Sequence, residues 1–490
     1  MTNLDLFIIA AYALGMLAVG RYYSTRTADT EQYLLGGRTM NPFMIGLSLF
    51  ATLTSSLSYL ALPGELIGHG PMIFAQLASY PIVAFVVGWL LIPAFMKLKV
   101  TSAYELLESQ LGISGRLLGA TMFVVLRLVW MSAILYATAD IVLAPLLGLQ
   151  DSTIPYVCAA MGLITVVYTT EGGMRAVVIT DAMQSFIMLF GTIVCVGAIS
   201  FQLGGWNAWW PTTWYSHWDQ PVLWDSTVAH IPVAGAFANM LTWMICTAGS
   251  DQMAVQRYLA TRDAQSARRS FNISLLADVI VQIMLALAAL GVLAYFTAHP
   301  EQLSAGKNLV ESADQMFPRF ILIGLPSGLT GLLIAAILSA AMSSLSSGVN
   351  SSCAVILTDF IGRFRRDALL PAQSVRLARG TSAVIGTLMV SLSMLLGYVP
   401  GNLLEKCFKA VNLFVAPLFV LFFLAMFVPW STPLGAFLAT AASIAVAVGV
   451  SFLGWFGVGF LWMLPCSLAT GILVGALASP LFRRNQKLAA

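Results

Sequence analysis

Long runs of apolar residues, joined by short polar connections, dominate the chain. A run of about 20 apolar residues is long enough to cross the hydrocarbon core of a bilayer as a helix. The runs predict thirteen such spans, at residues 4–20, 42–68, 71–97, 117–146, 154–169, 176–200, 231–255, 272–297, 319–349, 377–397, 403–428, 433–454 and 457–481. This pattern indicates an all-α polytopic membrane protein.

The composition supports this fold class and excludes several functions. Of the 490 residues, 59% are hydrophobic and only 9% are charged, whereas a soluble protein carries about a quarter charged residues. A cytosolic enzyme and a disordered chain are therefore excluded, and a net charge of +3 is too small for a nucleic-acid binder. The chain has no phosphate-binding G-x-x-x-x-G-K-[ST] motif, so nothing indicates an ATP-driven pump. The six cysteines stand singly in apolar stretches and are expected to be small buried residues, with no disulfide or metal site (Cys158, Cys195, Cys246, Cys353, Cys407 and Cys466).

The distribution of positive charge predicts the orientation in the membrane, because cytoplasmic loops are enriched in Lys and Arg. With the N-terminus outside, the inside loops and tail hold 19 of the 24 basic residues: Arg21, Arg26, Arg38, Lys97, Lys99, Arg116, Arg175, Arg257, Arg262, Arg268, Arg269, Arg363, Arg365, Arg366, Arg376, Arg379, Arg483, Arg484 and Lys487. Only Lys307, Arg319, Lys406 and Lys409 fall outside. We expect an outside N-terminus and a cytoplasmic C-terminus. No basic residue precedes the first span, so a cleaved signal peptide is not expected.

The longest outside loop, residues 201–230, holds half of the tryptophans of the chain and no Lys or Arg: Trp206, Trp209, Trp210, Trp214, Trp218 and Trp224. An interfacial aromatic belt is favoured there over a gating lid. The four histidines also fall at or near outside ends of spans (His69, His217, His230 and His299). A proton relay at the middle of the membrane could therefore not use histidine.

Two spans look unwound. The second contains Phe50-Ala-Thr-Leu-Thr-Ser-Ser-Leu-Ser58 followed by Pro63-Gly64, and the seventh contains Cys246-Thr-Ala-Gly-Ser-Asp-Gln252. Transporters with inverted repeats bind substrate where paired helices unwind near the midplane. Five spans separate the two stretches, and an odd repeat length places the two copies in opposite orientations. The spacing thus favours a five-plus-five inverted repeat.

The ninth span contains a serine run, Ala340-Ala-Met-Ser-Ser-Leu-Ser-Ser-Gly348. On a helix Ser343, Ser346 and Ser347 share one face. Hydroxyls one turn apart can supply several of the five or six oxygen ligands that a hard cation such as sodium takes. Alternatively, the small residues let helices approach closely and their hydroxyls bond to the preceding turn. The sequence leaves both interpretations open.

Charged residues inside spans are a sharper indication of function, because they are costly in a membrane. Asp181 lies within the sixth span, and its structural alternative is an ion pair with Arg175. Arg127 lies about three turns into the fourth span, where it could bind an anionic substrate or pair with a carboxylate. Asp140, Glu65 and Asp278 lie nearer to span ends, and we expect interfacial roles for them.

Several of these stretches together resemble the sodium:solute symporter family. They are the unwound segment from Ala51 to Ser58, Lys99-Val-Thr-Ser-Ala-Tyr-Glu-Leu-Leu-Glu108, Tyr168-Thr-Thr-Glu-Gly-Gly173 with Thr180-Asp181, Asp251-Gln-Met-Ala-Val-Gln-Arg-Tyr-Leu259 and the serine run. The similarity spans nearly the whole chain, and it is greatest to the branch that carries sialic acid, multivitamins, monocarboxylates and iodide.

The resemblance implies a leucine-transporter-like fold with a ten-helix core. Its expected parts are a leading helix and inner loop (1–41), a first repeat with core helices one to five (42–200), the outer Trp-rich loop (201–230), a second repeat with core helices six to ten (231–428), and two trailing helices with a cytoplasmic tail (429–490). It also implies a sodium site formed by the backbone oxygens of Ala51, Thr54 and Ala340 and the hydroxyls of Ser343 and Ser344.

The sialic acid branch implies further site residues. A second sodium site would use Asp181, Ser343, Ser346 and Ser347. Ser55, Ser58 and Gln76 match polar substrate contacts, and Trp130 stands where that branch has the arginine that meets the carboxylate of sialic acid, with Arg127 one turn earlier. Sialic acid itself is therefore in doubt. Trp130, Trp243 and Thr247 are expected to line a more aromatic pocket.

The function predicted is sodium-driven import of a small organic solute across the inner membrane by alternating access. Arg127 favours an anion such as a carboxylate or a sugar acid; a neutral sugar or amino acid, or coupling to protons, are the alternatives. No enzymatic activity and no obligatory protein partner are implied. Because Arg175 is poorly placed on the helix to pair with Asp181, a bound sodium is the expected counter-ion, and two sodium ions per substrate are predicted.

Overall fold

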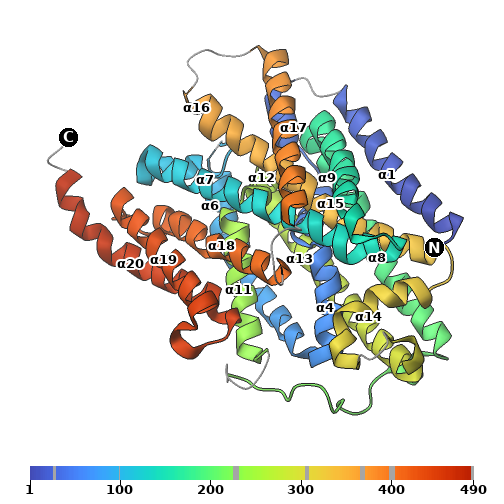
Figure 1. Ribbon diagram of the computed structural model, residues 1–490. Coiled ribbons are helices and arrows are strands. Elements are labelled where there is room, and N and C mark those ends of the chain that lie inside the picture. The colour runs from blue at the N-terminus through green and yellow to red at the C-terminus, as the bar shows by residue number, and fades with distance from the viewer. Residues whose placement is uncertain are drawn as a thin grey trace.

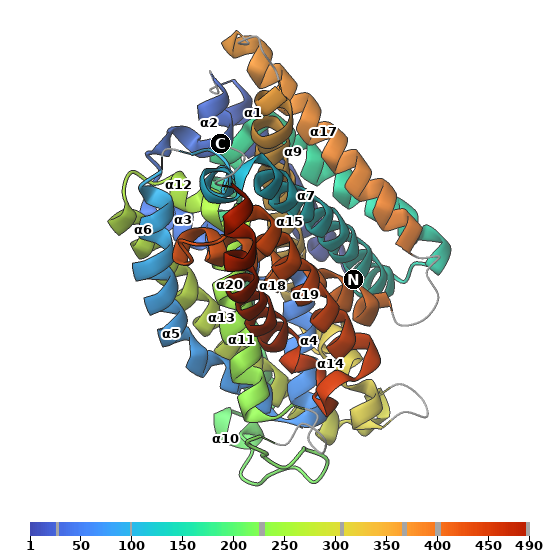
Figure 2. The same ribbon diagram turned by 90° about the vertical axis from the view of Figure 1, so that its left-hand side faces the viewer.

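The computed structural model describes residues 1–25, 29–98, 100–224, 231–303, 308–364, 370–396 and 403–486. These residues form a bundle of helices without strands (Figures 1 and 2). The predicted all-α fold class is confirmed. The orientation argument included Arg26, Lys99, Lys307, Arg365, Arg366 and Lys487, which lie outside the described residues, as does His230; the side chains of Lys406, Cys407, Arg483 and Arg484 are not described either.

In the first half of the chain, the main elements, apart from short 3-10 turns of three residues, are α1 (Asn3–Ser24), α2 (Thr30–Leu35), α3 (Pro42–Leu53), α4 (Ser56–His69), η2 (Pro71–Ser79), α5 (Tyr80–Phe85), η3 (Val86–Leu91), α6 (Ile92–Met96), α7 (Glu105–Ala137), η4 (Thr138–Leu143), α8 (Ala144–Leu147), α9 (Ile154–Gln202) and α10 (Trp206–Trp209). In the second half they are α11 (Val233–Ser250), α12 (Gln252–Leu259), α13 (Ala264–Ala298), α14 (Leu309–Ile323), α15 (Leu329–Val355), η7 (Ile356–Ile361), α16 (Gly362–Phe364), α17 (Pro371–Leu396), α18 (Leu403–Phe427), α19 (Pro433–Leu453) and α20 (Met463–Gln486).

Within the described residues, nine helices are long and apolar enough to cross a membrane, or ten if the bent pair α3–α4 forms one span. Among the nine, α9 is a single element of 49 residues. At a rise of 1.5 Å per residue it would extend about 74 Å if straight, more than twice the roughly 30 Å of the hydrocarbon core. Gly173 kinks it with a positive φ of 60°, between the predicted fifth and sixth spans. The total of thirteen spans remains a prediction.

Several predicted spans have different boundaries in the structure, and two of them concern breaks between helices. The ninth was expected to begin at residue 319, but a separate helix, α14, covers Leu309–Ile323, and α15 begins only at Leu329. The seventh was expected to end near residue 255, but α12 continues to Leu259. In the ninth span, the hydropathy run did not distinguish one helix from two helices joined at a short break. In the seventh, the apolar run stops before the helix does, because α12 continues through the polar residues Gln256 and Arg257.

The short helices in the connections between the long helices lie at two opposite ends of the bundle. Figure 2 places α2 at one end and α10 at the other, and Figure 1 places α16 and α14 at opposite ends. This separation matches the predicted division into inside and outside segments. Which end faces the cytoplasm remains a prediction.

The outer Trp-rich segment packs partly against the bundle. Trp209 and Trp218 are buried, whereas Trp206, Trp210 and Trp224 are exposed. Trp218 lies against Gly70 at the end of α4, and the backbone N–H of Asp219 donates to the carbonyl of His69 at 3.1 Å. The segment therefore combines exposed rings, as expected of an interfacial belt, with one ring that covers the end of α4.

Candidate functional site

The break in the second span forms one wall of the candidate site. Helix α3 ends at Leu53, Thr54 and Ser55 are extended, and α4 leaves at an angle of 63° to α3. The last carbonyl groups of a helix lack partners within the helix and lie at the negative end of its dipole. The carbonyls of Ala51 and Thr52 therefore accept hydrogen bonds from another helix.

The donors are serines of α15. Ser343 donates to the carbonyl of Ala51 at 2.7 Å and to that of Ala340 at 3.2 Å. Ser344 donates to the carbonyl of Thr52 at 3.1 Å and to that of Ala340 at 3.3 Å. Four of the five predicted ligands of the first sodium site are thus gathered on two facing helices, all buried. The fifth, Thr54, lies at the adjoining break, and its hydroxyl bonds to Asp278 at 3.0 Å.

The predicted second sodium site contains a cationic side chain of the protein. Asp181 is fully buried, and its Oδ2 accepts hydrogen bonds from Ser48 at 2.6 Å, from Ser347 at 3.2 Å and from the guanidinium of Arg257 at 2.8 Å. Ser346 is 3.5 Å from Oδ1. Arg257 also donates to the hydroxyl of Ser347. Ser343 reaches this cluster only through its carbonyl, which accepts from Ser346 at 3.1 Å.

Arg257 corrects two sequence-based expectations. It was counted among the inside-loop residues, but it is 1% exposed on α12 and lies within the bundle. The structure thereby supplies a positively charged partner for Asp181, whereas a bound sodium ion, rather than a basic side chain, was expected in that role. Arg175 does not pair with Asp181, as its position on the helix indicated; its guanidinium donates to the carbonyl of Gly36 at 3.3 Å.

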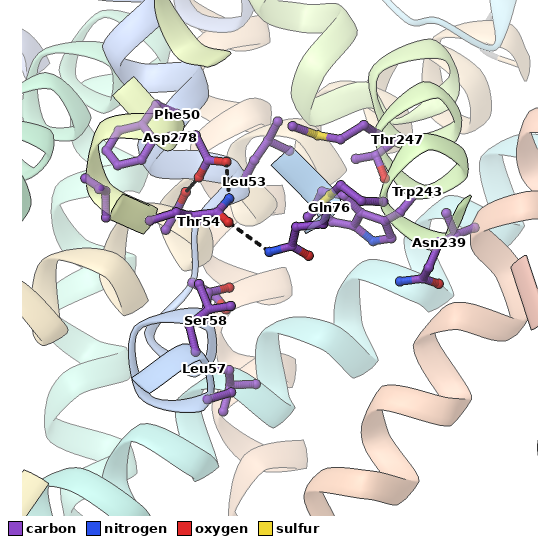
Figure 3. Close-up of a pocket in the computed structure, with 18 of the residues that line it drawn as sticks. Phe50, Leu53, Thr54, Leu57, Ser58, Gln76, Asn239, Trp243, Thr247 and Asp278 are labelled. Carbon is purple, nitrogen blue, oxygen red and sulfur yellow. Dashed lines mark hydrogen bonds between the residues drawn. The ribbon is translucent and has the colours of Figure 1, made fainter. Parts of the chain in front are cut away.

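A cavity of about 300 Å³ lies beside the break between α3 and α4. All seven predicted substrate contacts line it: Ser55, Ser58, Gln76, Arg127, Trp130, Trp243 and Thr247. Figure 3 shows Thr54 and Asp278 on one side of this space and Trp243, Thr247 and Asn239 on the other, with Gln76 between them. The lining residues come from α3, α4, η2, α5, α7, α11, α13 and α18, together with Phe460 from the segment before α20.

Arg127 pairs with a carboxylate of the protein. Its guanidinium forms a buried ion pair with Asp251, the residue at the break between α11 and α12. Asp251 also caps α12 by accepting a hydrogen bond from the backbone N–H of Met253 at 2.8 Å. The sequence left open whether Arg127 binds an anionic substrate or pairs with a carboxylate, and the structure shows the pairing. Arg127 is also one of the residues that line the cavity.

Sequence reasoning missed several polar residues of the cavity, above all Asp278. An interfacial role was expected for this carboxylate, but it lies midway along α13 and borders the cavity with Tyr80 and Gln282. The indication was present in the sequence, because Asp278 and Gln282 are four residues apart and lie on one helical face. Asp278 was placed too near a span end because α13 begins at Ala264, eight residues before the predicted start of the span.

Comparison with known proteins decides the family. The model of the sodium:solute symporter family matches residues 33–442. The chain belongs to this family. It is 27% identical to the sodium/sialic acid symporter SiaT of Proteus mirabilis, over 98% of this chain and 96% of that protein. It is 28% identical to the sodium-coupled monocarboxylate transporter 1 of Xenopus laevis, over 93% of this chain and 72% of that protein.

The fold is that of the solved structures of such transporters. A sodium-coupled sialic acid symporter, solved in a substrate-bound outward-open state and described as having a novel sodium site, superposes with a TM-score of 0.86 at 24% identity, over 98% of both chains. The expected leucine-transporter-like fold is thereby confirmed. The chain is an integral membrane, sodium-coupled solute symporter that works by alternating access.

Proposed function

We propose that one sodium ion binds between the end of α3 and the serine run of α15. Its ligands would be the carbonyls of Ala51, Thr54 and Ala340 and the hydroxyls of Ser343 and Ser344. The observation that carries this proposal is the 2.7 Å contact between the Ser343 hydroxyl and the Ala51 carbonyl, which brings oxygens of two helices together. A hydroxyl hydrogen rotates freely, so these oxygens can turn their lone pairs toward a cation.

The substrate would occupy the cavity next to this ion. Thr54 belongs both to the proposed sodium site and to the cavity wall, so each ligand would stabilise the backbone conformation that the other needs. Such coupling is reciprocal: substrate must tighten sodium binding by the same factor by which sodium tightens substrate binding. The membrane potential adds about 2.3 kcal/mol per charge per 100 mV, which favours import.

The topology belongs to the same proposal. Segments 42–200 and 231–428 would form the two inverted repeats, with the broken helices α3–α4 and α11–α12 as corresponding elements. The bacterial relative SiaT and the distribution of Lys and Arg support an inner-membrane location with the N-terminus outside and the C-terminus in the cytoplasm.

The substrate would be a small polar solute with an apolar face. Ser58, Gln76 and Asn239 offer hydrogen-bonding groups, and Trp130 and Trp243 offer aromatic surface. The sialic acid and monocarboxylate relatives support an anion. An anion bound by Arg127, however, would have to compete with Asp251 for the guanidinium.

A thermal-unfolding screen of the purified protein tests this function. Sugars, amino acids, vitamins and carboxylates are added in sodium buffer and in potassium buffer at the same pH. We expect sodium alone to raise the melting temperature and a true substrate to raise it further only when sodium is present, because ligands that bind the native state stabilise it by mass action. Equal stabilisation in both buffers, with uptake driven by a proton gradient, would establish the proton-coupled alternative.

A further inference from the structure

Asp278 brings a negative charge to the cavity. It lies on α13, is partly exposed, and is one of the residues that line the cavity. Its position is shown in Figure 3, where the carboxylate lies beside Thr54 at the break of the second span. A carboxylate at this depth in a membrane protein is costly and marks a functional site unless a partner compensates it.

Neutral groups surround this carboxylate. Oδ1 accepts a hydrogen bond from the hydroxyl of Thr54 at 3.0 Å, and Oδ2 accepts from the amide of Gln282 at 2.6 Å and from the hydroxyl of Tyr80. Two further bonds hold the Gln282 amide in this orientation: its Oε1 accepts from the amide of Gln76 at 2.8 Å, and its Nε2 also donates to the hydroxyl of Tyr80 at 2.8 Å. Among the described residues, Asp278 forms no ion pair with Lys, Arg or His.

The basic residue on the opposite wall does not neutralise it. Among the described residues that line the cavity, Arg127 is the only Lys or Arg, and its charge is balanced by Asp251. When that pair is counted as neutral, the formal charge left on the described lining residues is the one negative charge of Asp278. The charge balance of the site therefore favours a cationic ligand group over an anionic one.

The donors around Asp278 favour an ammonium group over a metal ion. An ionised carboxylate offers about four lone-pair positions, and three are used by Thr54, Tyr80 and Gln282. A sodium ion would need five or six oxygen ligands, and the amide N–H of Gln282, which cannot turn away as a hydroxyl hydrogen can, already occupies Oδ2. A single N–H donor arriving from the cavity needs only one lone pair.

The rest of the cavity suits the same kind of group. Trp130, Trp243 and Phe50 present aromatic rings to the space. Aromatic faces attract cations by about 0.5–2 kcal/mol, more when water is excluded. A protonated nitrogen bound at Asp278 would therefore meet a carboxylate on one side and the aromatic ring of Trp243 across the cavity (Figure 3).

We propose that the transported solute carries a protonated amine and that Asp278 is the residue that binds it. This inference rests on the proposed function, because it takes the cavity as the substrate site. It identifies a specificity determinant distinct from Arg127. It also shifts the expected substrate from a simple anion to an amine or an amino acid, in which any carboxylate would be secondary.

The test compares ligands that share one ring and differ in charge. One series is glucosamine, glucose and glucuronate, of which only glucosamine carries a protonated amine. The other series is prolinamide, proline and tetrahydro-2-furoate, of which prolinamide and proline carry one. Melting temperature and dissociation constants are measured for the full chain in potassium or sodium phosphate, since amine buffers would compete. In at least one of the two series, we expect the amine-bearing members to stabilise the protein in sodium phosphate more strongly than the members without an amine.

Variants assign the effect to the carboxylate. Asp278→Asn should weaken binding of the amine at least tenfold, and Asp278→Glu should keep the preference for the amine. The matched control Asp359→Asn removes another buried carboxylate, one that contacts Ser102 and Arg116 away from the cavity, and should keep amine binding within twofold. The sodium-induced stabilisation of each variant reports on its fold and on the sodium site.

Three results would overturn the inference. They are a wild-type chain that none of the amine-bearing members stabilises, a preference for glucuronate or tetrahydro-2-furoate, and amine binding that Asp278→Asn leaves unchanged. In each case, a normal response to sodium shows that sodium binding stands while the assignment of the substrate fails. If sodium itself does not stabilise the wild-type chain, the proposed sodium site is wrong.

Discussion

The guanidinium of Arg257 lies 2.8 Å from Oδ2 of Asp181, at the centre of a buried group of hydroxyls from α3 and α15. Both side chains are excluded from solvent. This ion pair places a cation of the protein where a second sodium ion was expected. A sodium ion at Asp181 would have to share the carboxylate with this guanidinium, and the repulsion between the two cations opposes its binding. The pair therefore bears directly on the number of ions transported.

The first prediction concerns that number. While Arg257 remains paired with Asp181, sodium should activate transport with a Hill coefficient near one. Arg257→Gln leaves the buried carboxylate uncompensated and open to sodium, so the coefficient should rise toward two. The measurement is sodium-dependent uptake and charge movement in reconstituted vesicles. The double variant Asp181→Asn/Arg257→Gln is the control, with a coefficient near one, and a coefficient of two in the unmodified protein would contradict the prediction.

The second prediction concerns the serine run of α15. Ser343→Ala removes a hydroxyl that lies 2.7 Å from the Ala51 carbonyl, and we expect the sodium concentration for half-maximal stabilisation to rise about tenfold, which corresponds to roughly 1.4 kcal/mol. Ser351→Ala is the matched control, because that buried hydroxyl bonds only to Ser347 and Gly348 of its own helix. Similar sodium affinities in the two variants would remove Ser343 from the site.

The third prediction separates the two roles of Arg127. Arg127→Gln leaves Asp251 buried without its partner, and breaking a buried ion pair costs about 3–5 kcal/mol. The melting temperature should fall, and Arg127→Gln/Asp251→Asn should recover most of it. If Arg127 only supports the break in the seventh span, substrate affinity in the double variant should stay within about threefold. A loss of substrate affinity without a loss of stability would show that Arg127 binds an anion.

The fourth prediction concerns the packing that positions α3. A Cβ atom at Gly46 would lie 2.7 Å from the Ser270 carbonyl and from Ile273 on α13, so Gly46→Ala should cost about 1–3 kcal/mol by overpacking. It should also weaken sodium binding, because α3 carries the Ala51 carbonyl. Gly15→Ala on α1 has open space around it and should stabilise its helix by up to about 1 kcal/mol. Thermal unfolding with and without sodium measures both effects.

The sequence by itself determined the elements that depend on local order. Apolar runs of sufficient length predict membrane helices because burial of the backbone in lipid requires helical hydrogen bonds. The Ser- and Thr-rich stretch at Thr54 predicts a break for an equally local reason, and Ser343 and Ser344 lie on α15 as their spacing indicates. The candidate site residues could be selected at this level because the motifs resemble those of one family.

Only the tertiary structure decided which charged side chains meet. Asp181 and Arg257 are 76 residues apart, and their contact depends on how α9 and α12 each pack against α3 and α15, which no periodicity records. The same holds for Arg127 on α7 and Asp251 at the break between α11 and α12. It also holds for Asp278, whose depth in the membrane depends on where α13 begins. A long side chain such as that of arginine can reach a carboxylate on a different helix. The charge balance of a buried site is therefore a property of how the helices pack. The sequence predicts that the site exists, and the packing determines what charge it presents to a ligand.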